Sequence, residues 1–303
     1  MQIKHVAVAG PNGTLGPSII PNLLKEGFQV TALSRNIEKT RAAFPGVDAK
    51  EADYSSIDGL AAVLKTVRPD AVVCLLNRHA YQEQANLIDA SIVAGVPHLI
   101  PSSFGVNTTD PEVRWLPPIL EKVRMENYVR RKAEESNGKF TYTMINTGMF
   151  LDWAMKMQVL VNLKNDGQPS RIFNSGDVKA SGTVLDDVGL AVAHALQKRD
   201  QLINRTCSIH STSFSQNQLL AYAQELAPGR KFETVTIDTA EMQRQAQEKY
   251  DQGDSSPMTL RPFLMHATFG SGLSLFQKVD NEILDIPIWS KEKVMALVKE
   301  AME

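Results

Sequence analysis

The sequence has few cysteines and no long apolar runs. Only two of its 303 residues are cysteines, Cys74 and Cys207. Because they stand 133 positions apart, each inside an apolar run, we expect two reduced core thiols and a cytoplasmic location. The longest apolar runs, such as 71–76, have about six residues, whereas a membrane span needs about 20. Strand-like residues 3–9 stand where a secretory leader would be, so we expect no leader and no membrane partner.

An excess of charge of either sign is also missing. The chain has 32 Lys and Arg against 34 Asp and Glu, a formal net charge of −2. A nucleic-acid-binding surface needs a clear positive excess, so we expect no nucleic-acid partner. The six histidines show no metal-ligand spacing, and we expect no metal. With 43% hydrophobic and 22% charged residues, the composition is typical of a globular protein.

The first half of the chain repeats a short β-branched run, a turn and a helical stretch. Strands are predicted at 3–9, 29–33, 47–51, 71–76, 98–101 and 141–146. Helices with apolar residues at i, i+3 and i+4 are predicted at 15–26, 57–66, 81–94 and 118–136. This alternation predicts an α/β fold with a doubly wound parallel sheet, covered by helices on both faces.

After residue 150 the pattern is less regular. Strands are predicted at 171–174, 205–210 and 232–237, and helices at 151–163, at 239–249 and from Asp186 and Ser215 onward. We therefore predict a first, ligand-binding domain over 1–150, completed by part of 171–210. A smaller α/β domain over 151–303 is predicted to bind the substrate.

A glycine-rich turn joins the first strand to the first helix. Residues 6–16 read VAVAGPNGTLG, with Gly10, Gly13 and Gly16 in G-x-x-G-x-x-G spacing. Glycine permits a positive φ and lets the backbone approach a pyrophosphate, while the helix N-terminus offers unpaired N–H groups. A tight turn with incidental glycines is the alternative. We predict a dinucleotide site in a Rossmann-type domain.

The end of the second strand indicates which dinucleotide is bound. NAD sites usually have Asp or Glu there, whereas this strand ends in Ser34-Arg35, with Lys39 one turn further. Because a guanidinium can chelate a 2′-phosphate, we predict NADPH or NADP+; a solvated Arg35 is the alternative. Asp53, after the third strand, is a candidate adenine contact or the cap of the next helix.

Two lysines of the helix at 118–136 compete for a catalytic role. Tyr128 and Lys132 match the Tyr-x-x-x-Lys signature of short-chain dehydrogenases, and Ser103 lies upstream. Ligands of an open α/β sheet bind beyond the carboxyl ends of its strands, and Lys132 lies about 15 Å further along this helix than Lys122. We expect Lys122 to be the general acid or base; a surface lysine paired with a neighbouring glutamate is the alternative.

Further motifs follow in order: QANLIDA at 84–90, AGV at 94–96, PSSFG at 101–105 and INTGMFLD at 145–152. With the glycine turn and Arg35, they make the chain resemble the NmrA-like and isoflavone-reductase-like family of atypical short-chain dehydrogenases, in particular its fungal branch. The resemblance implies a Rossmann domain, a smaller substrate domain, NADPH as cofactor and a role in secondary metabolism. It also implies a lone catalytic lysine in place of the Tyr–Lys pair, here Lys122.

The resemblance further implies individual cofactor contacts. They are Gly10, Asn12, Gly13, Thr14 and Leu15 for the phosphates, Arg35 and Lys39 for the 2′-phosphate, Leu76 and Asn77 for the ribose, Ser103 and Phe104 beside the nicotinamide, and Gly148 and Phe150 at the substrate cleft. The chain departs from plant members at Pro11, Ser103 and Glu126, where those proteins have glycine, glutamate and arginine. The plant substrates are therefore not expected to carry over.

Together these residues predict hydride transfer from NADPH to a mid-sized aromatic or conjugated small molecule. Candidate substrate contacts are Met149, Trp153, Met157, Phe263, His266 and Phe269, although such stripes more often belong to a core. Two alternatives stay open: a non-catalytic NADP(H)-sensing regulator, and a redox-neutral isomerase or cyclase. The expected partner is a small molecule, bound by a monomer or homodimer.

Overall fold

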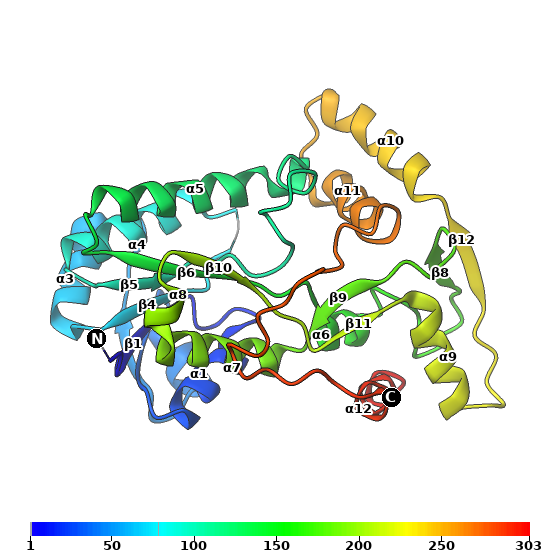
Figure 1. Ribbon diagram of the computed structural model, residues 1–303, viewed down its shortest axis with the longest axis horizontal. Helices are drawn as coiled ribbons and strands as arrows, with labels where there is room; N and C mark the ends of the chain where they lie inside the picture. The colour runs from blue at the N-terminus through cyan, green and yellow to red at the C-terminus, as the bar shows by residue number, and fades with distance from the viewer. Residues whose placement is uncertain (1, 78) are drawn as a thin grey trace.

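The computed structural model describes residues 2–77 and 79–303 and has a seven-stranded parallel sheet at its centre (Figure 1). The strands are β1 His5–Ala9, β2 Gln29–Ser34, β3 Asp48–Glu51, β4 Ala71–Cys74, β5 His98–Ile100, β6 Thr141–Asn146 and β10 Arg205–Ser208. Their order is β10-β6-β5-β4-β1-β2-β3. The direction of winding reverses between β1 and β4, as in the Rossmann fold. The predicted α/β fold is confirmed.

Helices cover both faces of this sheet (Figure 1). On one face, α1 Gly16–Lys25 packs against α7 Leu185–Gln197, and on the other lie α3 Ile57–Val67, α4 Tyr81–Val93 and α5 Leu120–Glu135. Because successive strand side chains point to opposite faces, Val6 and Val8 of β1 join the core under α1, and Ala7 and Ala9 join the core under α3. All of these helices were predicted from the sequence, within one or two residues at most ends.

Several short elements differ from the prediction. The helix α2 Ile37–Ala43 was missed, although Asn36 caps it by accepting a hydrogen bond from the backbone N–H of Lys39 at 2.9 Å. The short helix η1 Pro117–Ile119 precedes α5, and α8 Arg199–Leu202 follows α7. No described helix is long and apolar enough to cross a membrane.

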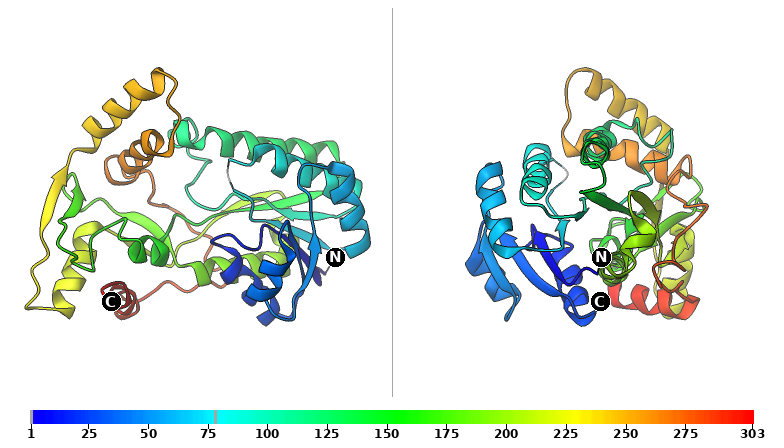
Figure 2. Two further views of the ribbon diagram at one scale, coloured as in Figure 1. Left: turned by 180° about the vertical axis from the view of Figure 1, so that it is seen from behind. Right: turned by 60° about the vertical axis from the view of Figure 1, so that its left-hand side comes forward.

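The second half forms two small sheets and a set of helices. The strands β7 Met149–Phe150, β9 Ala180–Thr183 and β11 Thr212–Phe214 make one sheet, and β8 Ser170–Phe173 pairs with β12 Thr234–Ile237. The helices are α6 Leu151–Lys156, α9 Gln216–Leu226, α10 Thr239–Asp251, α11 Pro257–Phe269 and α12 Lys291–Ala301. Figure 2 shows α12 far from the N-terminus, and α11 packs against η1.

The chain returns to the large sheet after residue 180. The strand β10 pairs with β6, and α7 packs against α1, so both lie with the first-half elements. The predicted helix at 151–163 is wrong beyond Lys156, because Gln158 adopts a left-handed conformation with φ 54°. A division of the chain near residue 150 stays a prediction.

A buried histidine makes stability depend on pH. His98 begins β5 and is fully buried, and its Nδ1 lies 2.9 Å from the Thr141 hydroxyl. Burial, assisted by the nearby Arg199 charge, lowers its pKa from 6.5 to about 3. Below pH 6.5 the unfolded chain therefore takes up a proton that the folded protein does not, so stability falls as the pH drops from 6.5 towards 3.

We expect His98 to cost about 1.4 kcal/mol of unfolding free energy for each pH unit below about pH 6. His98→Asn should remove this contribution, which urea titrations of both proteins from about pH 4.5 to 6.5 would measure. The same pH slope in both proteins would contradict the assignment.

Candidate active site

A cavity of about 700 Å³ opens beyond the carboxyl ends of the central strands. Its walls come from the segments that follow β1, β4, β5 and β6, together with η1, α5, α6 and α11. This is the edge at which open α/β sheets bind ligands. The described residues contain no group of three or more His, Cys, Asp or Glu side chains that could hold a metal ion.

The glycine turn after β1 forms one wall and depends on two residues that lack a side chain. Gly10 has φ +79°, and a Cβ there would lie 3.0 Å from the backbone of Leu75. At Gly16 a Cβ would lie 1.7 Å from the carbonyl oxygen of Pro11, which no side chain could tolerate. The turn therefore brings the start of α1 to the cavity. No side chain caps this helix, so its first N–H groups can bind an anion.

Other side chains hold the turn from behind. The N–H of Gly10 donates to the hydroxyl of Tyr54 at 3.1 Å, and that hydroxyl donates to a β2 carbonyl at 2.6 Å. The Asn12 amide donates to the hydroxyls of Ser34 at 3.2 Å and Thr40 at 2.9 Å. Gly10 and Asn12, predicted to touch the phosphates, do not line the cavity. Their polar groups are used to join the turn to β2 and α2.

The predicted 2′-phosphate contacts lie outside the cavity. Arg35 and Lys39 are exposed at the end of β2 and on α2. Arg35 directly follows Ser34, whose hydroxyl accepts from the Asn12 amide, so its backbone lies next to the glycine turn. Burial raises the pKa of Tyr54. The Asp53 carboxylate accepts from the N–H and hydroxyl of Ser55, which lowers its pKa. Asp53 does not cap α3, because Ser56 does.

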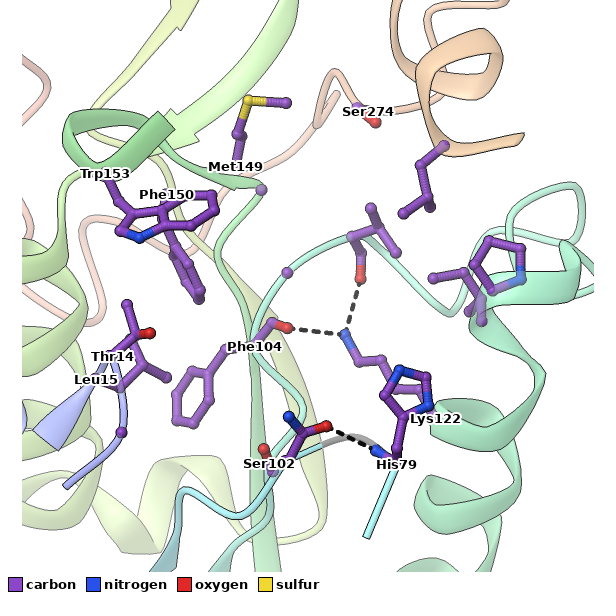
Figure 3. Close-up of a pocket in the computed structure, with 18 of the residues that line it drawn as sticks. Thr14, Leu15, His79, Ser102, Phe104, Lys122, Met149, Phe150, Trp153 and Ser274 are labelled. Carbon is purple, nitrogen blue, oxygen red and sulfur yellow. Dashed lines mark hydrogen bonds between the residues drawn. The ribbon is translucent and has the colours of Figure 1, made fainter. Parts of the chain in front are cut away.

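Lys122 enters the cavity from the first turn of α5. It is 9% exposed, and its Nζ donates to the carbonyls of Phe104 at 3.3 Å and Val106 at 3.4 Å (Figure 3). Both carbonyls belong to the loop after β5, and Figure 3 shows the Phe104 ring turned towards Leu15 of the glycine turn. The ammonium group is thus held in the wall by backbone oxygens, on the loop that meets the turn.

Tyr128 and Lys132 lie elsewhere. The carboxylate of Asp89 on α4 accepts from the Tyr128 hydroxyl at 2.7 Å and pairs with the Lys132 ammonium at 2.7 Å. Neither residue lines the cavity. The two side chains that match the signature therefore connect α5 to α4 through Asp89.

Ser103, predicted to lie beside the nicotinamide, does not line the cavity. Its hydroxyl is buried and accepts the N–H of Ile145 at 3.1 Å, so it faces β6 and not the cavity. The neighbouring Ser102 lines the cavity instead, and its hydroxyl donates to the carbonyl of Leu76 at 2.9 Å. The chain bends at Ser102, where the N–H of Ser103 donates to the carbonyl of Pro101 at 2.7 Å, and the sequence does not say which of the two serines faces the cavity.

Four of the predicted substrate contacts do not line the cavity either. Met157 is 58% exposed outside the cavity. Phe263 and Phe269 are buried against Tyr250 and Phe173. The Nδ1 of His266 lies 2.9 Å from the hydroxyl of Thr239, so this ring also faces away from the cavity.

The structure brings together a subset of the predicted site residues and several that were not predicted. The predicted ones that line the cavity are Gly13, Thr14, Leu15, Leu76, Asn77, Phe104, Lys122, Gly148, Met149, Phe150 and Trp153. The lining residues missed are Leu75, His79, Ser102, Gly105, Val106, Pro118, Ile119, Leu264, Met265, Thr268 and Ser274. Several of these lie one to three residues from a predicted one. A position close to the end of a predicted strand was therefore the sequence signal that could have identified them.

Comparison with known proteins identifies the family. The model of the NmrA-like family matches residues 2–259, well over half of the sequence. The chain belongs to the NmrA-like family. The resemblance inferred from the motifs is confirmed.

Relatives and solved structures extend this comparison. The oxidoreductase aprR of Aspergillus flavus is 29% identical over an alignment of 305 positions, which covers 98% of this chain and 99% of aprR. The NADPH complex of leucoanthocyanidin reductase from Vitis vinifera has a TM-score of 0.70 at 20% identity, over 91% of this chain and 90% of that one. Triphenylmethane reductase of Citrobacter sp., complexed with NADP(H), has a TM-score of 0.72 at 18% identity, over 98% and 99%. These likenesses place the NmrA-like protein in the Rossmann-type fold.

Two glycines of the turn should respond differently to alanine. Gly16→Ala would force a Cβ into the Pro11 carbonyl, and we expect it to lower the unfolding free energy by at least about 2 kcal/mol. Gly13→Ala is the matched control, because its Cβ would lie 3.5 Å from the nearest atom and its φ is not positive. Its stability should stay within about 1 kcal/mol of the unsubstituted protein. Denaturant unfolding of both variants measures the two unfolding free energies. An equal loss of stability in both variants would contradict the claim that, of these two glycines, only Gly16 must lack a side chain.

Proposed function

We propose that this NmrA-like protein is an NADPH-dependent oxidoreductase that reduces a mid-sized aromatic or conjugated small molecule. One observation carries the proposal: the uncapped N-terminus of α1 and the side chain of Lys122 line the same cavity. The name of the A. flavus relative and the NADPH and NADP(H) complexes of the two structural neighbours support it.

The residues around the glycine turn fit the cofactor. The backbone of 13–15 at the start of α1 would bind the pyrophosphate, where the helix dipole favours negative charge. Arg35, which is exposed and follows the turn-bound Ser34, and Lys39 would bind the 2′-phosphate. Leu76 and Asn77 would flank the ribose, since they line the cavity directly after β4. When bound, NADPH supplies a hydride from C4 of its nicotinamide ring.

The far part of the cavity would orient the substrate. Phe104, Phe150 and Trp153 offer aromatic surface, and Trp153 is 42% exposed, which places it at the mouth. Such a wall favours flat, apolar molecules over charged ones. Lys122 would donate a proton to a substrate oxygen that gains negative charge during reduction, or accept one in the reverse direction. The carbonyls of Phe104 and Val106 keep its ammonium group at the cavity wall.

The cofactor choice can be tested at Arg35. Arg35→Asp should raise the dissociation constant of NADPH by about 10- to 100-fold, because it removes a charge-assisted contact and adds a like charge. The affinity for NADH should stay the same or rise. Titration calorimetry with both cofactors measures this. Arg41→Asp, the same charge reversal on the exposed surface of α2, is the control, and an equal loss in both variants would contradict the role of Arg35.

The role of Lys122 can be tested by turnover. Lys122→Met should bind NADPH within about threefold of the unsubstituted protein yet oxidise it at least about 100-fold more slowly with a panel of enones, quinones and benzylic ethers. Lys132→Met, on the same helix but paired with Asp89, should behave like the unsubstituted protein. Tight NADPH binding without turnover of any substrate would favour a cofactor-sensing regulator. Product formation without NADPH consumption would favour an isomerase or cyclase.

A further inference from the structure

A pair of hydroxyl groups stands in the apolar part of the cavity wall. Thr268 of α11 and Ser274 of the following loop both line the cavity and are 4% and 6% exposed. Their oxygens lie 2.8 Å apart. Figure 3 shows Ser274 on the side of the cavity away from His79 and Ser102. Leu264 and Met265, also on α11, line the same cavity with apolar side chains.

The hydrogen bonding of this pair is incomplete. Two hydroxyls bring two donor hydrogens, and the bond between them uses one. In the part of the chain that the structure describes, neither hydroxyl makes another side-chain hydrogen bond to an acceptor; the remaining O–H has no protein partner. A polar hydrogen left unpaired in an apolar wall is costly, so a ligand atom that accepts it would bind favourably.

We propose that Thr268 and Ser274 form a subsite for an uncharged oxygen at the end of the substrate remote from its reacting carbon. The inference deepens the proposed function and rests on it for the identity of the bound molecule as substrate. An ether or carbonyl oxygen can accept a hydrogen bond from the one free O–H of the pair, and a hydroxyl group can also donate to the lone pairs of the two oxygens. A carboxylate or phosphate does not suit this pair, because it needs several donors or a cation, and the one free O–H of the pair supplies neither. The substrate would thus carry two oxygen functions, one near Lys122 and one near the hydroxyl pair.

The test uses probes that differ in one oxygen. On each of two enone scaffolds, a benzylideneacetone and a chalcone, a para-methoxy compound is compared with its para-ethyl analogue, which has nearly the same shape. Their dissociation constants are measured by calorimetry in the presence of saturating NADP+. On at least one scaffold we expect the methoxy compound to bind about 3- to 10-fold more tightly, the worth of one hydrogen bond. This preference should disappear in the double variant Thr268→Val, Ser274→Ala.

The controls separate this inference from the proposed function. Ser271→Ala changes an exposed hydroxyl of the same loop that does not line the cavity, and it should keep the preference. NADP+ binding by every variant shows that it is folded. Absence of a methoxy preference on both scaffolds, or its survival in the double variant, would overturn the subsite while leaving NADPH oxidation untouched. Loss of NADP+ binding or of turnover by the unsubstituted protein bears on the proposed function alone.

Discussion

The site depends on the close approach of two backbone segments at the turn between β1 and α1. Gly10 lies against the backbone of Leu75, where a Cβ would be crowded at 3.0 Å, and Gly16 lies against the carbonyl of Pro11, where a Cβ at 1.7 Å is excluded. This approach brings the start of α1 to the carboxyl ends of β1 and β4. Tyr54 and Asn12 then hold the turn with hydrogen bonds from behind, so the cradle is formed before any ligand binds.

The loop after β5 supplies the second half of the site, and it is fixed from both sides. Ser103 ties its start to β6 through the N–H of Ile145. Further along, the hydroxyl of Thr108 donates to the buried carboxylate of Glu126 at 2.7 Å, one turn beyond Lys122 on α5. Between these two points lie the carbonyls that receive the Lys122 ammonium group. Glu126, where plant members have arginine, thus supports the loop against the helix that carries the lysine.

Much of the first half could be predicted, because its strands are buried on both faces and its helices are long and periodic. The glycine turn could also be predicted, because the backbone conformation and close contacts of the turn require glycine at Gly10 and Gly16. The face of α11 was not readable, since Phe263 and Phe269 turned inward and Leu264 and Thr268 faced the cavity. Apolar residues stand on several sides of this helix, so only the tertiary packing decides which of them turn inward. The strands β7, β9 and β11 have two to four residues and carry too little periodicity to be recognised.

The central claim is that one cavity joins an anion-binding helix start to Lys122. A crystal structure of the protein with NADP+ tests it most directly. The account predicts the pyrophosphate on the backbone N–H groups of 13–15, the 2′-phosphate within hydrogen-bonding distance of Arg35, and the nicotinamide ring between Phe104 and Lys122. A dinucleotide bound elsewhere on the sheet, or a ring directed away from Lys122, would contradict it.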